Sequence, residues 1–261
     1  MIRYGLKLWS NNTQWFPEAV ARHARREFDF VEVYSNSDVP HDYTSLAALK
    51  QMPVEGVHMG HLDHAGFHEF FLTDAQTEAW QMTVALADFF RAPRIIVHPA
   101  TTHKSDTFWE NLERLQDDRV VIESMPVVSP YGGNPRQFGA ALADLREVHG
   151  RGVPQCLDIE KSIKAAVYYE MPYQEFLETA LTELHPLYFH ISGGRAQTPI
   201  DEHMDLWDAT FDVPWVHARL EDYAKDKDIF LAFETPKAGA GLENDMKNMD
   251  YFRTARGTTA L

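Results

Sequence analysis

Residues 229–236, with the sequence IFLAFETP, place a glutamate at the end of an apolar run. Five apolar residues precede Glu234, and Pro236 then stops further strand hydrogen bonding because it lacks an N–H group. An apolar run of this kind is typical of a strand that is buried on both faces of a parallel sheet. A carboxylate at its end needs a partner, because burying an uncompensated charge is costly.

Seven further apolar runs occur along the chain, at residues 2–9, 28–34, 54–59, 93–99, 119–125, 154–160 and 187–192. Between them lie segments with helical spacing of apolar residues, including 16–28, 74–90, 136–150, 173–184 and 213–226. Eight strands alternating with helices predict an α/β protein, a (β/α)8 TIM barrel that forms one domain over residues 1–261. A doubly wound open sheet is the alternative; the alignment of polar residues at the strand ends favours the barrel.

The composition is that of an ordinary globular protein, with 44% hydrophobic and 24% charged residues. No apolar run approaches the roughly 20 residues of a membrane helix, and the N-terminus lacks the pattern of a signal peptide. The lone cysteine, Cys156, excludes an internal disulfide and reads as a buried, inert thiol. We therefore expect a cytoplasmic protein without a membrane partner. The net charge of −15 weighs against nucleic acid as a partner.

Polar residues end six consecutive predicted strands. Because the carboxyl ends of barrel strands meet at one mouth, these side chains should converge there. They are His58, His98, Glu123, Asp158, His190 and Glu234, and the loop before the last strand adds Asp201 and His203. Carboxylates gathered in this way need compensation, which one or two divalent metal ions would supply. Mixed imidazole and carboxylate ligands suit Zn, Mn, Fe or Co better than Ca or Mg.

The order and spacing of these residues resemble the xylose isomerase-like TIM-barrel superfamily, which includes sugar isomerases and epimerases and endonuclease IV (AP endonuclease family 2). The resemblance covers essentially the whole chain. It implies a one-ion site shared with the isomerases and epimerases, made by Glu123, Asp158, His190 and Glu234. Endonuclease IV adds ligands that here match His58, His98, Asp201 and His203, with Glu123 bridging two ions.

Lys161 departs from the pattern of this superfamily. The motif after strand six is usually Asp-x-x-His, whereas this chain has Asp158-Ile159-Glu160-Lys161. A protonated lysine has no lone pair to offer a metal. We therefore expect one or two ions rather than three.

The first candidate reaction is isomerisation or epimerisation of a small polyhydroxy or keto substrate, possibly phosphorylated. A bound ion would acidify the C–H group next to a carbonyl, and Glu123 and Glu234 would transfer the proton. Lys161 would steady the developing negative charge. Arg195 and His61 are the candidate substrate-binding residues. Aromatic side chains in the loop at residues 60–71 would form a lid, or pack against a helix.

The second candidate is phosphodiester hydrolysis of the endonuclease IV kind, for which His58 and His98 would support a second ion. The loops after the first three strands, SNNTQW, SNSDVPHDY and GHLDHAGFHEFF, contain no Lys or Arg. DNA binding requires several such phosphate contacts, so a small-molecule substrate is the stronger expectation. A barrel that binds without catalysing is the third alternative. Either a monomer or a homo-oligomer is compatible with the sequence.

Overall fold

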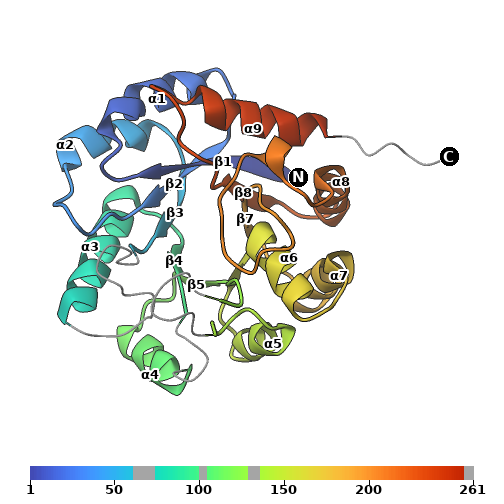
Figure 1. Ribbon diagram of the computed structural model, residues 1–261. Helices are drawn as coiled ribbons and strands as arrows, with labels where there is room; N and C mark the ends of the chain where they lie inside the picture. The colour runs from blue at the N-terminus through green and yellow to red at the C-terminus, as the bar shows by residue number, and fades with distance from the viewer. Residues whose placement is uncertain (61–73, 100–104, 129–135, 256–261) are drawn as a thin grey trace.

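The sheet is a closed barrel of eight parallel strands (Figure 1). The computed structural model describes residues 1–60, 74–99, 105–128 and 136–255. Neighbouring strands pair in chain order, and β1 also pairs with β8, which closes the sheet. The strands are β1 (Ile2–Trp9), β2 (Phe30–Tyr34), β3 (Val54–His58), β4 (Ile95–Val97), β5 (Val120–Glu123), β6 (Gln155–Asp158), β7 (Tyr188–Ile191) and β8 (Ile229–Phe233). The predicted barrel is confirmed, and the open sheet is excluded.

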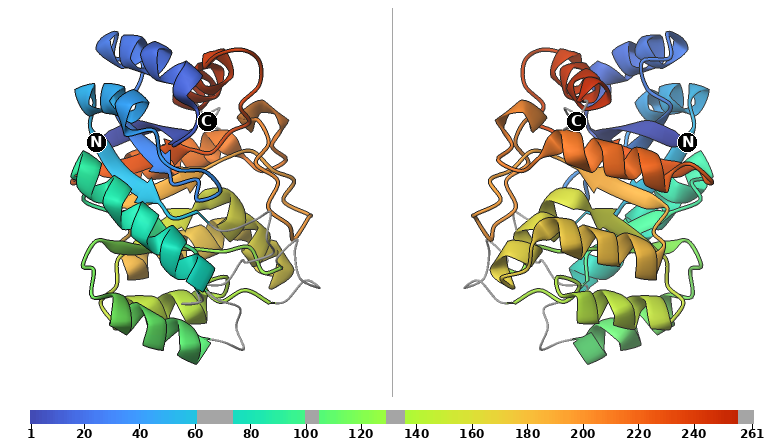
Figure 2. Two further views of the ribbon diagram at one scale, coloured as in Figure 1. Left: turned by 90° about the vertical axis from the view of Figure 1, so that its left-hand side faces the viewer. Right: turned by 90° about the vertical axis from the view of Figure 1, so that its right-hand side faces the viewer.

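Helices surround the barrel on its outer face (Figures 1 and 2). They are α1 (Phe16–Ala24), α2 (Tyr43–Leu46), α3 (Asp74–Phe90), α4 (Ser105–Leu115), α5 (Leu142–Gly150), α6 (Ile159–Tyr168), α7 (Tyr173–Leu184), α8 (Val213–Tyr223) and α9 (Glu243–Thr254). The last helix lies beside α1, where Arg22 pairs with Glu243 at 3.3 Å, so the two ends of the chain close the ring together. In the part of the chain that the structure describes, no helix is long and apolar enough to span a membrane.

The core has two parts. A large outer part packs the helices against the barrel, and a smaller inner part fills the barrel below its mouth. The inner residues are Phe30, Ile96, Val121, Cys156, Tyr188 and Ala232. Gly5 makes room for one of them, since a Cβ atom there would lie 2.2 Å from the ring of Phe30. Burial raises the pKa of the Cys156 thiol to about 12, which agrees with an inert thiol.

Several boundaries differ from the prediction by a few residues, for example the end of α1 at Ala24, and two of the differences bear on the site. The helix expected at residues 136–150 begins only at Leu142, because Arg136 pairs with Val128 in an isolated bridge and Gly139 turns the chain at a φ of +85°. Strand β6 ends at Asp158, and α6 begins at the next residue without a loop. The Asp158 carboxylate caps this helix by accepting the Lys161 N–H at 3.0 Å. Lys161 therefore lies in the first helical turn, directly at the barrel mouth.

Candidate active site and metal centre

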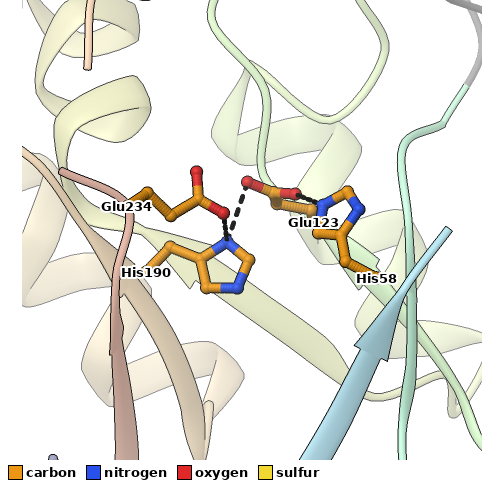
Figure 3. Close-up of side chains that lie close together, drawn as sticks. All are labelled: His58, Glu123, His190 and Glu234. Atoms are coloured by element: carbon orange, nitrogen blue, oxygen red, sulfur yellow. Dashed lines mark hydrogen bonds and ion pairs between the residues drawn. The ribbon is translucent and has the colours of Figure 1, made fainter. Parts of the chain in front are cut away.

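Four of the predicted ligands form one buried cluster at the mouth. His58, Glu123, His190 and Glu234 each offer a ligand atom, and these atoms all lie within 4.8 Å of one another. His58 and Glu123 are the last residues of β3 and β5, and His190 is the next-to-last residue of β7. Glu234 directly follows β8. Figure 3 shows the carboxylates of Glu123 and Glu234 both directed toward the His190 ring.

Glu123 is the centre of this cluster because its two carboxylate oxygens face different groups. Its Oε1 atom lies 2.5 Å from Lys161 Nζ and 3.1 Å from His190 Nδ1. Its Oε2 atom lies 2.9 Å from both His58 Nε2 and His98 Nε2. Burial alone would raise the pKa of Glu123, but the charge of Lys161 and the neighbouring histidines hold it well below its usual value. Glu123 is therefore an anion that bridges two sets of groups.

Two histidines are oriented as metal-binding histidines usually are. Nδ1 of His58 donates to the Met59 carbonyl at 2.9 Å, and Nε2 of His190 donates to Glu32 at 2.7 Å. A ring N–H held by such an acceptor leaves the opposite nitrogen aimed into the cluster. Burial lowers the pKa of His58, so its Nε2 lone pair faces an oxygen of Glu123. An ion held by both His58 and Glu123 would relieve this contact between two lone pairs, so the donor set fits a divalent ion.

The Lys161 ammonium lies among carboxylates. Besides Glu123, its Nζ atom lies 3.2 Å from Asp158 Oδ2, 3.6 Å from Asp201 Oδ2 and 3.9 Å from Glu234 Oε2. Burial alone would lower the pKa of Lys161, but these carboxylates raise it well above its usual value. The side chain is 2% exposed. Lys161 is thus a permanent positive charge inside the site.

A second buried lysine, Lys7, was not anticipated from the sequence, and neither was its partner Glu32. They are paired residues on β1 and β2, with Nζ and Oε1 3.0 Å apart, and Lys7 also forms an ion pair with Glu234. Glu32 accepts the Tyr188 hydroxyl at 2.8 Å. Burial favours the neutral form of Glu32, but His190 and Lys7 outweigh it and lower the pKa to about 2. The sequence feature that could have indicated this pair is a charged residue inside each apolar stretch, Lys7 in GLKLW and Glu32 in FVEVY.

Asp158 has a structural role in addition to its place at the mouth. One oxygen caps α6, and the other pairs with the Lys161 ammonium. Asp201 and His203 form their own pair, with Oδ2 and Nε2 2.8 Å apart, and His203 Nδ1 contacts the Glu234 carbonyl at 3.0 Å. Asp201 and His203, which match ligand positions of endonuclease IV, therefore lie at the edge of the cluster beside Glu234.

Of the two candidate substrate-binding residues, Arg195 lies outside the cluster. Arg195 has a side chain that is 60% exposed, and its guanidinium pairs with Glu202 at 2.5 Å. It is not among the described residues that line the cavity over the cluster. His61 and the aromatic lid of the 60–71 loop lie outside the described residues, apart from Gly60.

A cavity of about 400 Å3 lies over the cluster, within the size range of small-molecule sites. Its lining includes Trp9, Tyr34, Lys161, His203, Glu234 and Lys237. The rings of Trp9 and Tyr34 lie 5.0 Å apart and form one wall. Glu234 lines this cavity, whereas Glu123 lies fully buried at the centre of the cluster.

Solved structures with the same fold include two epimerase-type proteins and an endonuclease. A D-tagatose 3-epimerase-like protein is 14% identical, with a TM-score of 0.66, covering 97% of this chain and 96% of that one. Endonuclease IV from Thermus thermophilus is 17% identical, with a TM-score of 0.69, covering 97% and 98%. A 3-keto-D-glucoside 4-epimerase from E. coli is 13% identical, with a TM-score of 0.64, covering 97% and 100%.

At such low identity these structures show the shared fold alone, which is the fold that the resemblance implies. No protein-family model matches the chain, and no curated protein matches it either.

Proposed function

We propose that this protein is a divalent-metal-dependent isomerase or epimerase acting on a small polyhydroxy or keto substrate in the cytoplasm. The observation that carries the proposal is the position of the Glu234 carboxylate. It lines a cavity of small-molecule size, and its Oε2 atom lies 3.9 Å from the Lys161 ammonium. A carboxylate and an ammonium side by side are the pair that a proton transfer next to a carbonyl requires.

The residues have different roles in this proposal. His58 and His98 would hold the ion together with the Oε2 atom of Glu123, whereas His190 contacts the Oε1 atom of Glu123. The ion would polarise the substrate carbonyl when bound. Glu123 is fully buried and is not among the described residues that line the cavity, so in this proposal it holds the site together. Glu234 lines the cavity and would move the proton at the substrate carbon. This is narrower than the sequence-based expectation, in which both glutamates transferred protons.

Lys161 would serve as a hydrogen-bond donor and not as a base. Its pKa is raised well above the usual value, so it stays protonated around neutral pH. An ammonium beside the cavity would stabilise the negative oxygen that develops when the neighbouring C–H group is deprotonated.

Phosphodiester hydrolysis is the second candidate, and a specific contact favours it. Both His58 and His98 approach the same oxygen of Glu123, as a second metal site would require. The charges that line the cavity favour the small-molecule isomerase or epimerase instead. Among the described residues, the lysines that line this cavity are Lys7, Lys161 and Lys237, and each pairs with a buried carboxylate. Lysines neutralised in this way leave little positive charge for phosphates.

The test is a substrate panel assayed with purified, metal-loaded protein. Ketohexoses, aldohexoses and keto-glycosides are incubated separately, and products are resolved by chromatography. We expect interconversion of at least one sugar pair, loss of that activity in Glu234→Gln, and full activity in Glu221→Gln, whose side chain on α8 is 62% exposed. Efficient cleavage of a duplex with an abasic site, without sugar conversion, would instead support hydrolysis.

A further inference from the structure

We propose that the Lys161 ammonium is a built-in cation that takes the place of a metal ion, so that the mouth holds one ion and not two. The inference rests on the metal centre of the proposed function, but not on which reaction that centre catalyses. It concerns how this chain balances the charge of its buried carboxylates.

Four carboxylates surround the Lys161 ammonium. Its Nζ atom lies within 4 Å of oxygens on Glu123, Asp158, Asp201 and Glu234. These four side chains come from different parts of the barrel mouth, and their negative charges converge on one point. Such a group of anions needs a cation at its centre. An ammonium meets this need with three N–H donors and a charge of +1.

The chain also fixes Lys161 in this place. Helix α6 begins directly after β6, and the Asp158 cap holds the backbone N–H of Lys161. In the next turn, the Lys164 ammonium lies 2.8 Å from both Glu160 and Glu202 and so ties α6 to the loop before α8. Because only 2% of the Lys161 side chain is exposed, its charge stays inside the site.

The two oxygens of Glu123 face different kinds of groups. On the Oε1 side lie the ammonium of Lys161 and the ring of His190, and Lys7 adds a second ammonium beside Glu234. Another cation on this side would be repelled at short range in a poorly solvated site. On the Oε2 side lie the two imidazoles of His58 and His98, which are neutral ligands when unprotonated. A single ion therefore belongs on the Oε2 side.

The experiment counts metal ions in the full chain by equilibrium dialysis against buffered Zn2+ and elemental analysis. We expect about one ion per chain in the wild type and in Lys161→Arg, which keeps the charge, and about two in Lys161→Gln, which removes it. Lys225→Gln is the charge-matched control, because it removes one ammonium whose side chain is 71% exposed and pairs with Asp222 at the surface. It should bind about one ion, like the wild type.

Two further readouts keep the proposal testable if a variant is unstable. Zn2+ should raise the unfolding temperature of Lys161→Gln more than that of the wild type, because a second ion then compensates the unpaired anions. Anomalous diffraction from wild-type crystals grown with Zn2+ should show one peak, next to His58 and His98. Two ions per wild-type chain, a peak in contact with Asp158, or equal ion counts in Lys161→Gln and the wild type would each overturn the proposal. A failed sugar assay would leave these counts unaffected.

Discussion

Replacing Lys7 by methionine tests whether the buried ion pairs of the mouth are coupled to folding. The Lys7 side chain is 11% exposed, and it pairs with Glu32 at 0% and Glu234 at 4% exposure. Removing one partner of a buried pair costs about 3–5 kcal/mol, since the other charge stays behind. We expect the lower end, about 3 kcal/mol, because Glu32 keeps its hydrogen bonds from Tyr188 and His190. That loss is large against a total stability of about 5–15 kcal/mol.

Urea unfolding at neutral pH measures this change. The midpoint should fall in Lys7→Met while the slope m stays the same, because the surface exposed on unfolding is unchanged. The double variant Lys7→Met/Glu32→Gln should recover part of the lost stability, because it also removes one of the two buried carboxylate charges left without the lysine. Lys225→Met is the control, because this exposed lysine pairs only at the surface, and its midpoint should not move. A loss below about 1 kcal/mol in Lys7→Met, as for a surface pair, would refute the reasoning.

The remaining predictions concern the metal centre and the backbone that supports it. Dialysis against a strong chelator should lower the unfolding temperature, and Zn2+ or Mn2+ should restore it; an unchanged temperature would argue against a bound ion. Gly193→Ala should destabilise the protein by about 1–3 kcal/mol in urea unfolding, since the new Cβ would lie 2.1 Å from the Asp205 carbonyl oxygen. Asp158→Ala should be less stable than Asp158→Asn by about 1 kcal/mol, because asparagine still caps α6; equal stabilities would show that the cap contributes nothing.

The barrel and most of the cluster were predictable because they depend on strand order alone. Parallel strands that pair in sequence bring their carboxyl ends together, so a polar residue at each end must lie near the others. His58, Glu123, His190 and Glu234 were found in this way, and the structure gathers them. The predicted strands match the observed ones to within a few residues for the same reason.

Other parts of the site depend on contacts that a single sequence does not show. Lys7 and Glu32 lie inside apolar strands, where alternation alone does not tell whether a side chain points into the barrel or toward the helices. Their pairing follows from the register of β1 against β2. The surroundings of Lys161 depend on α6 beginning directly after Asp158, whereas residues 159–160 were expected in the strand. The structure pairs Arg195, a candidate substrate-binding residue, with Glu202 seven residues later in the same loop, a contact that strand and helix periodicity does not indicate.

Deuterium exchange is the sharpest test of the proton transfer assigned to Glu234, because it reports transfer at carbon whether or not a product accumulates. Metal-loaded protein is incubated with the substrate panel in D2O, and NMR follows the proton on the carbon next to the carbonyl. We expect this proton to be replaced by deuterium with the wild type and with Glu221→Gln, but not with Glu234→Gln. Exchange that persists undiminished in Glu234→Gln, or sugars that never exchange with fully loaded wild type, would contradict the proposed reaction.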